Sequence, residues 1–387
     1  MPSVRSLLAT PLPEPPPALR RGPFAADADE HAPHDARTAA LLGRALGTAF
    51  GLCFLTGLVS HLHQHPVAWF ELPSRPVWGY QLTQGLHVAT GIASVPLLLA
   101  KLWTVYRRLF AWPPAPHVGR LLERLLVVPL VAGAVFELAT GLLNVVQWYP
   151  FGFGFPVAHY AVAWVVVGAL LVHLGVKAPL ARAVTGRRHA GPPSPQRRAV
   201  LLGASAAVGA VTLATVGQTV GTLRAVSLLA PRDPAVGPQG LPVNRTAAAA
   251  QVAAAATDPG WRLDVAGRLR LSLADLQALP QYEADLPIAC VEGWSATARW
   301  GGVRLRDVLD LAGVPAGSHL TAVSLEHSGY RTSPVGPGAA RDPLTLLALR
   351  VNGQPLQLDH GYPLRLIAPG RPGVLQTKWL SAIEVQA

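Results

Sequence analysis

The sequence predicts two parts of different fold class: a bundle of about five membrane-spanning α-helices, followed by a mixed α+β domain. Half of the 387 residues are hydrophobic and only 14% are charged, and the mean hydropathy is +0.32, which is too apolar for an ordinary soluble protein. The apolar residues form long runs up to about residue 222. Beyond it, short alternating apolar and polar runs separated by Gly and Pro indicate a globular domain that contains strands.

Residues 1–36 precede the first apolar run and are rich in Pro, Ala and charged residues, without hydrophobic periodicity. Such a segment cannot bury enough apolar surface to offset the entropy of folding. It also lacks the pattern of a cleavable signal peptide. We therefore expect a disordered cytoplasmic tail.

Residues 37–222 contain five apolar runs, each close to the roughly 20 residues that a helix needs to cross a bilayer. The predicted transmembrane helices lie at about 39–61, 82–106, 121–146, 157–179 and 199–221. The region should therefore contact membrane lipid on most of its surface.

The basic residues predict the orientation of these helices, because Lys and Arg accumulate in cytoplasmic loops. They gather between the second and third runs and between the fourth and fifth runs: Lys101, Arg107, Arg108, Arg120 and Arg124, then Arg182, Arg187, Arg188, Arg197 and Arg198. An odd number of crossings of the cell membrane then places residues 223–387 outside the cytoplasm. No nucleic-acid-binding motif accompanies the net charge of +11, so a nucleic-acid partner is not expected.

Residues 223–387 are expected to form the extracytoplasmic domain. Runs at 261–265 and 320–325 predict strands, and the patterns at 247–256, 273–278 and 305–312 predict helices. A domain of roughly 150 residues is large enough to bury its own core.

The two cysteines stand in different surroundings. Cys53 lies in the first apolar run, where a small packing role is expected, whereas Cys290 lies between a strand-like run and a turn that contains Gly. On its own, a lone cysteine is more often an inert core residue than a ligand.

The neighbours of Cys290 change that interpretation. Six short motifs follow one another in residues 235–387: Leu-Pro-Val-Asn-Arg at 241–245, Cys-Val-Glu-Gly-Trp-Ser at 290–295, Trp-x-Gly-Val-x-Leu at 300–305, Leu-Leu-Ala-x-x-Val-Asn-Gly-x-Pro-Leu at 346–356, His-Gly-Tyr-Pro-Leu-Arg at 360–365 and Lys-Trp-Leu at 378–380. In this order they resemble the sulfite oxidase-like family of molybdopterin-binding domains. The resemblance implies that Cys290 is the protein ligand of molybdenum, a role that suits a soft thiolate.

The resemblance also implies residues that hold the pterin and its phosphate, which call for fixed cationic and amide donors. These are Asn244, Arg245, His360, Arg365 and Lys378. Tyr330 falls in the loop 326–331, where the family has residues that line the metal, and it is a candidate catalytic residue. The alternatives are surface charge for Arg365 and Lys378, a structural role for His360, and packing in a turn for Tyr330.

One departure from the family bears on the substrate. Sulfite oxidases continue after the ligand cysteine with Gly-Asn-Arg-Arg, whose arginines serve an anionic substrate, whereas Glu292 to Ser295 follow here. The resemblance therefore does not extend to sulfite. Reduction of a small sulfoxide or another oxide is favoured, although the direction of the reaction stays open.

Histidines in the apolar runs are functional candidates because a polar group there is costly. His87 lies near the outer end of the second run, His159 begins the fourth, and His173 lies fourteen residues deeper, about 21 Å along a helix. His87 and His159 are the candidate ligands of an outer haem b iron, with His61, His63 and His65 as alternative partners. A quinone site, a proton relay and a structural role are the other interpretations.

Taken together, the sequence predicts a membrane-bound molybdenum-cofactor oxidoreductase. It would perform two-electron chemistry, in particular oxygen-atom transfer, outside the membrane and exchange electrons through the membrane domain with haem b and quinone. One alternative is a tethered binding module without catalysis. Another is an enzyme whose membrane part is only an anchor and whose electrons come from a soluble carrier. Arg197 and Arg198, followed by an apolar stretch, also resemble an internal twin-arginine translocation signal.

Overall fold

The computed structural model describes Ser6 and residues 9–13, 35–67, 69–109, 117–186 and 194–386. Most of the predicted tail lies outside the described residues, as do Arg187 and Arg188 and the side chains of Arg107 and Arg108. By their internal contacts the residues divide into two compact units. One combines Met1–Phe54 with Val88–Thr212, and the other combines Leu55–His87 with Leu213–Ala387.

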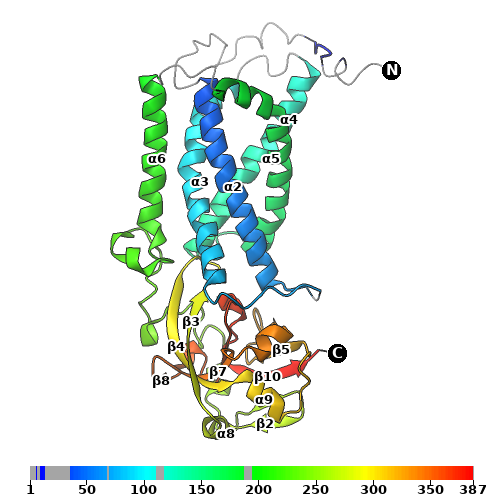
Figure 1. Cartoon of the computed structure of the whole chain (residues 1–387), viewed down its shortest axis with the longest axis vertical. Coiled ribbons are helices and arrows are strands. Elements are labelled where there is room, and N and C mark those ends of the chain that lie inside the picture. Colours follow the sequence, from blue (N-terminus) through cyan, green and yellow to red (C-terminus); the bar gives the residue numbers. More distant parts are fainter. Residues whose placement is uncertain are drawn as a thin grey trace. The chain divides into compact units, whose positions relative to one another are not determined.

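Five long helices confirm the predicted helical region (Figure 1). In the part of the chain that the structure describes, these are the helices long and apolar enough to cross a membrane. Their bounds are α2 Ala36–Gln64, α3 Gly79–Leu109, α4 Val118–Val145, α5 Phe155–Thr185 and α6 Pro195–Val216. The last of them ends earlier than predicted because the chain turns at Gly217, whose N–H donates to Ser227 Oγ at 2.7 Å.

Helices α4 and α5 pack closely against each other within the first unit. Gly133 permits this approach, because a Cβ there would lie 2.5 Å from Cγ2 of Val166. Small residues at helix interfaces serve the same purpose in membrane proteins. Near the other end of the pair, Glu123 forms ion pairs with Arg120 at 2.8 Å and with Lys177.

The C-terminal part is a mixed α+β domain, as predicted, and its strands form two five-stranded sheets. The first sheet has the order β2-β1-β10-β5-β6, formed by Leu269–Leu271, Leu263–Val265, Leu380–Val385, Leu320–Ser324 and Thr332–Val335. The second has the order β3-β4-β7-β8 with β9 paired to β7, formed by Tyr282–Ala289, Ser295–Arg304, Leu346–Val351, Gln354–Pro355 and Arg365–Ile367. Two hydrophobic cores contain most of the buried apolar side chains of the domain, and the larger one draws on strands of both sheets.

The short helices of this domain agree in part with the sequence prediction. Helix α8, Leu273–Ala278, coincides with the predicted helix, and α9, Leu305–Leu311, is one residue shorter than predicted. The predicted helix at 247–256 is reduced to α7, Ala253–Ala256. The reason lies at Gln251, whose φ of 57° is incompatible with a continuous right-handed helix. A fourth helix, α10, Pro337–Arg341, precedes β7.

Candidate functional site

Cys290 lies directly after strand β3, in the tight connection to β4. Its N–H donates to the carbonyl of Trp294 at 2.9 Å, and the N–H of Gly293 donates to the carbonyl of Cys290 at 3.0 Å. Gly293 has a φ of 93°, a conformation that glycine adopts without strain. The side chain of Cys290 is only 3% exposed. The turn therefore fixes the thiol in a buried position.

The Cys290 sulfur accepts a hydrogen bond from the amide of Asn244, Nδ2 to Sγ at 2.9 Å. Trp294 Nε1 donates to Asn244 Oδ1 and to Glu292 Oε2, each at 3.2 Å, and so fixes which end of the amide faces the sulfur. Burial, with a further contribution from Glu292, raises the pKa of the Cys290 thiol to about 12. A thiolate at this position therefore requires a cation, and a bound metal ion supplies one.

Residues far away in the sequence hold the same turn from the other side. Gln84 Nε2 donates to the carbonyl of Val291 at 3.0 Å, and the hydroxyl of Thr219 donates to the carbonyl of Gly293. Gln84 is 4% exposed and accepts from Ser60 Oγ at 2.9 Å. Sequence reasoning missed these residues, although polar groups inside apolar runs, such as Ser60 and Gln84, are a signal for them.

The cations predicted to hold the pterin and its phosphate, Arg365 and Lys378, both donate to backbone carbonyls. Arg365 is 6% exposed, its Nη1 donates to the carbonyl of His360 at 3.1 Å, and its guanidinium lies 5.2 Å from the ring of Trp300. Its Nε has no hydrogen-bond partner among the described residues. Lys378 Nζ donates to the carbonyls of Arg245 at 2.6 Å and Asp359 at 2.9 Å.

Burial lowers the pKa values of Arg365, Lys378 and His360. It lowers the pKa of Arg365 to about 9, and, together with the neighbouring Arg365, it lowers the pKa of Lys378 to about 7. Burial also lowers the pKa of His360 to about 4, so this side chain is neutral at pH 7. Because His360 Nε2 lies 2.7 Å from the carbonyl of Pro238, that nitrogen carries the proton and Nδ1 does not.

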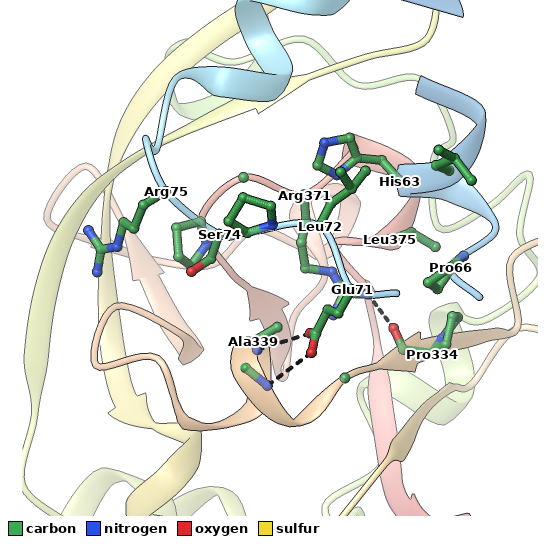
Figure 2. Close-up of a pocket in the computed structure, with 16 residues that line it drawn as sticks. His63, Pro66, Glu71, Leu72, Ser74, Arg75, Pro334, Ala339, Arg371 and Leu375 are labelled. Atoms are coloured by element: carbon green, nitrogen blue, oxygen red, sulfur yellow. Dashed lines mark hydrogen bonds between the residues drawn. The ribbon is translucent and has the colours of Figure 1, made fainter. Parts of the chain in front are cut away.

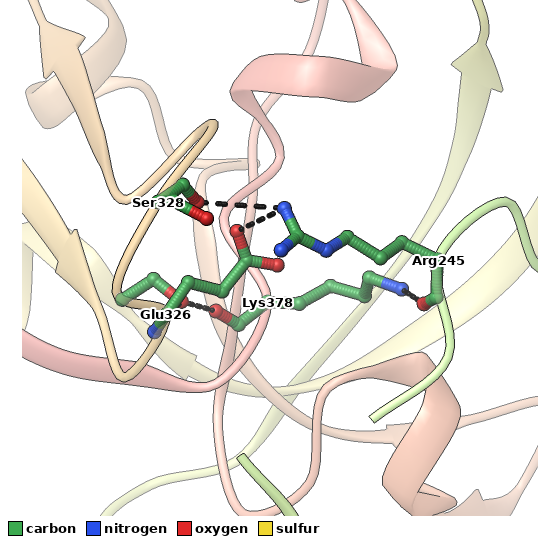
Figure 3. Close-up of polar contacts among 5 residues, drawn as sticks. Arg245, Glu326, Ser328 and Lys378 are labelled. Atoms are coloured by element: carbon green, nitrogen blue, oxygen red, sulfur yellow. Dashed lines mark hydrogen bonds and ion pairs between the residues drawn. The ribbon is translucent and has the colours of Figure 1, made fainter. Parts of the chain in front are cut away.

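Arg245 faces the loop that contains Tyr330 (Figure 3). Its Nη1 lies 3.3 Å from Glu326 Oε2 and donates to the carbonyl of Ser328 at 3.4 Å. Gly329 lies beneath the guanidinium, since a Cβ there would be 2.7 Å from Nη1. Tyr330 is 51% exposed. Partial burial of its phenol, followed by the charges of Cys290 and Glu292, raises the pKa of Tyr330.

The structure therefore brings Asn244 to Cys290, Arg245 to Lys378, and His360 to Arg365. Arg365 is buried and Lys378 is half-buried, and their described hydrogen-bond partners are neutral carbonyls, which compensate poorly for the desolvation of a charge. An anionic group beside them would compensate the charge. Together with the unpartnered Nε of Arg365, this donor set fits a phosphate-bearing pterin whose metal is held by the nearby thiol.

A buried thiol in the same domain as partly desolvated cations is a donor set that suits an anionic metal cofactor. Comparison with known proteins gives the class: residues 249–387 match the family model described as the oxidoreductase molybdopterin binding domain. The C-terminal part of the chain is therefore a molybdopterin-binding oxidoreductase domain of sulfite oxidase-like type, as the six motifs predicted.

Individual relatives agree with this assignment. The chain is 36% identical over 160 residues to human mitochondrial sulfite oxidase, covering 33% of this chain and 29% of that protein. It is 35% identical over 129 residues to the uncharacterized oxidoreductase YuiH of Bacillus subtilis, covering 32% and 64%. It is 31% identical over 129 residues to the putative protein-methionine-sulfoxide reductase subunit YedZ1 of Azospira oryzae, covering 32% and 48%. The chain thus spans less than two thirds of each of these relatives.

The histidines of the long helices have other partners in this structure. His159 Nε2 lies 3.1 Å from Glu137 Oε2, and its Nδ1 lies 3.0 Å from the hydroxyl of Thr140. His87 packs against Gly57, where a Cβ would lie 2.9 Å from its ring, and His173 lies half-buried in α5. No group of three or more His, Cys, Asp or Glu side chains suited to a metal occurs among the residues described. Haem ligation stays a prediction, and it requires His159 to give up one of its present partners.

Proposed function

We propose that the protein is a membrane-bound molybdenum-cofactor oxidoreductase that performs two-electron oxygen-atom transfer on a small substrate. The observation that carries this proposal is the buried Cys290 sulfur, 2.9 Å from the amide of Asn244, in the same domain as the buried Arg365 and the half-buried Lys378. When bound, the molybdenum cofactor supplies the exchange of an oxygen atom and two electrons.

The residues of this chain would bind and orient that cofactor. Cys290 would hold the metal, while Asn244 would donate to its sulfur and limit its movement. Arg245, His360, Arg365 and Lys378 would hold the pterin and its phosphate. Tyr330, half exposed on the neighbouring loop, would meet the substrate.

We infer that the reaction is the reduction of a sulfoxide or a comparable oxide. Such a reaction consumes the oxide, two protons and two electrons, and it releases the sulfide and one molecule of water. The name of the YedZ1 relative, a putative protein-methionine-sulfoxide reductase subunit, supports this substrate class. The missing arginines after Cys290 count against sulfite. The reductant would be a quinol, with a soluble electron carrier as the alternative.

The helical part would place the enzyme in the cell membrane, with the C-terminal domain outside the cytoplasm. Support comes from the five apolar helices and from the basic residues between them. Electrons would pass from quinol through haem b held by His87 and His159. If the helices serve only as an anchor, the same site would receive electrons from the soluble carrier.

The first experiment is to purify the full chain from its membranes and to measure molybdenum and pterin per polypeptide, together with reduction of dimethyl sulfoxide or methionine sulfoxide by a reduced dye. The proposal predicts about one molybdenum and one pterin per chain and measurable turnover. Protein without molybdenum after expression in a cell that makes the cofactor would contradict it. A binding module without catalysis would then be the better description.

A further inference from the structure

The end of helix α2, the start of α3 and the loop between them belong to the same compact unit as the C-terminal domain. The loop contacts that domain at two places. Glu71 accepts from the backbone N–H groups of Gly338 and Ala339, at 3.3 and 3.4 Å (Figure 2). Ser74 Oγ donates to Asp342 Oδ2 at 2.7 Å. These contacts fix both helix ends against the domain.

Two buried side chains of these helix ends form a chain of hydrogen bonds that leads to the turn of Cys290. Ser60 Oγ donates to Gln84 Oε1 at 2.9 Å, and Gln84 Nε2 donates to the carbonyl of Val291 at 3.0 Å. Ser60 and Gln84 are 6% and 4% exposed. Because Ser60 occupies the acceptor end of the amide, the donor end faces Val291. The carbonyl that accepts it belongs to the residue directly after Cys290.

One peptide unit connects this chain of bonds to the sulfur. The carbonyl of Val291 and the N–H of Glu292 are its two ends. Burial is the largest cause of the raised pKa of the Cys290 thiol, and the N–H of Glu292 opposes that effect by donating to the sulfur. A carbonyl that accepts a hydrogen bond polarises its peptide and strengthens the N–H at the other end. Gln84 therefore strengthens a donor to the sulfur that it does not itself contact.

A second side chain holds the same turn through a different peptide unit. The hydroxyl of Thr219 donates to the carbonyl of Gly293, which shares its peptide with the N–H of Trp294. Gly85, next to Gln84 in α3, permits this arrangement, because a Cβ there would lie 2.7 Å from Cγ2 of Thr219. Thr219 thus offers a comparison in which a contact to the turn is lost and the peptide of Val291 keeps its donor.

Hydrogen bonds to a sulfur ligand tune the metal that it holds. A donor withdraws negative charge from the sulfur, and this favours the reduced metal, whose ligands carry more charge. Weakening one donor should therefore lower the reduction potential. Loosening of the turn alone predicts no such fixed direction.

We propose that Gln84 is a positioning residue of the metal site, whose hydrogen bond to Val291 polarises the following peptide toward the Cys290 sulfur and raises the reduction potential of the metal. The inference rests on the proposed function, because it assumes molybdenum on Cys290. The residues that match the family model begin at 249. Helix α3 therefore supplies a part of the ligand's environment that the matched domain does not contain.

The test measures the reduction potential of molybdenum in the purified full-length protein, by redox titration of its Mo(V) electron paramagnetic resonance signal. Gln84→Met keeps an unbranched side chain that suits a helix and removes the donor. It should lower the potential by about 20 to 60 mV, which is about twofold to tenfold in a one-electron equilibrium. Ser60→Ala removes the group that orients the amide and should give a smaller shift in the same direction. It keeps the test available if Gln84→Met folds poorly.

Gln281→Met is the matched control. Gln281 Nε2 also donates to backbone carbonyls, those of Leu276 and Leu279 at 2.9 and 2.8 Å, away from the turn of Cys290. This variant should keep the potential of the wild type, and Thr219→Val should shift it less than Gln84→Met does. Equal potentials in wild type and Gln84→Met would overturn the proposal. An equal shift in Thr219→Val would overturn it too, since Gln84 would then only hold the turn.

A second measurement tests the polarised peptide without the metal. In protein labelled with nitrogen-15 glutamate, the amide resonance of Glu292 should move in Gln84→Met and stay in place in Gln281→Met. An unmoved resonance in Gln84→Met would contradict the inference whatever the metal content. A wild type without molybdenum would refute the proposed function, and a moved resonance would then leave the effect of Gln84 on this peptide in place.

Discussion

At the scale of single residues, the chemistry of the site depends on what burial does to charge. Arg365 is desolvated, and its described contacts are the carbonyl of His360 and the ring of Trp300. We predict that Arg365→Ala lowers cofactor occupancy, because losing a charge-assisted anchor costs about 1.5 to 3 kcal/mol, or roughly tenfold to a hundredfold in affinity. Pterin content of the purified variant is the measurement, with Arg299→Ala as the control. Full pterin occupancy in Arg365→Ala would show that Arg365 does not bind the phosphate of the cofactor.

Lys378 gives the site a pH dependence. Its pKa falls from 10.5 to about 7 in the cofactor-free protein, so the unfolded chain binds more protons between these values and the stability contributed by Lys378 rises with pH there. An anionic cofactor favours the charged form, and its binding must therefore take up a proton above pH 7. We predict that affinity for the cofactor falls by about tenfold per pH unit above 7. In Lys378→Met, reconstitution assays between pH 7 and about 8, below the pKa of Arg365, should show a flat profile, and an equally steep profile would disprove the role of Lys378.

Individual residues also explain why the sequence predicted some members of the candidate site and missed others. Cys290, His360, Arg365 and Lys378 stand in short motifs, so their residue types can be read locally. The contact of Gln84 with Val291 joins positions 207 residues apart, and no local pattern encodes such a pair.

At the scale of elements, length and hydropathy were sufficient for the five long helices, because a membrane span depends on composition more than on tertiary contacts. The helix predicted at 247–256 was mostly wrong, since Ala-rich composition favours a helix while the backbone at Gln251 interrupts it. Strands were predicted in this domain, but the two sheets and the strand order within them were not. Their pairings, such as β1 with β10, join the two ends of the domain.

The predicted haem ligands, His87 and His159, lie in helices α3 and α5. If His87 and His159 ligate iron, the purified protein shows the visible absorption of haem b, and both His87→Ala and His159→Ala reduce it substantially. His319→Ala, which changes an exposed histidine of the C-terminal domain, should leave the spectrum unchanged. The present bond of His159 to Glu137 gives the alternative a physical basis. A spectrum that neither helix variant alters would show that these histidines serve another purpose, such as proton transfer or helix packing.

At the scale of the whole molecule, the proposed location of the C-terminal domain outside the cytoplasm requires a route of export. Arg197 lies in the first turn of α6, and its N–H donates to Ser194 Oγ at 3.2 Å. A domain that binds molybdopterin in the cytoplasm must fold before export, so the pair Arg197 and Arg198 is expected to act as a twin-arginine signal. Changing both to Lys keeps the positive charge but removes the guanidinium groups that a receptor would recognise.

We predict that the double Lys variant keeps its first four helices in the membrane and retains residues 222–387 in the cytoplasm. Protease added to intact spheroplasts should digest the C-terminal domain of the wild type and spare that of the variant. Equal digestion would show that the two arginines set only the topology.

The identity of the metal ligand is the claim on which the whole account depends. Molybdenum X-ray absorption spectroscopy tests it most directly, because the spectrum reports the sulfur atoms bound to the metal. Cys290→Ser should retain the pterin, lose one sulfur neighbour of molybdenum and lower turnover by about a hundredfold or more. A Cys290→Ser protein with the sulfur coordination and the turnover of the wild type would contradict the assignment.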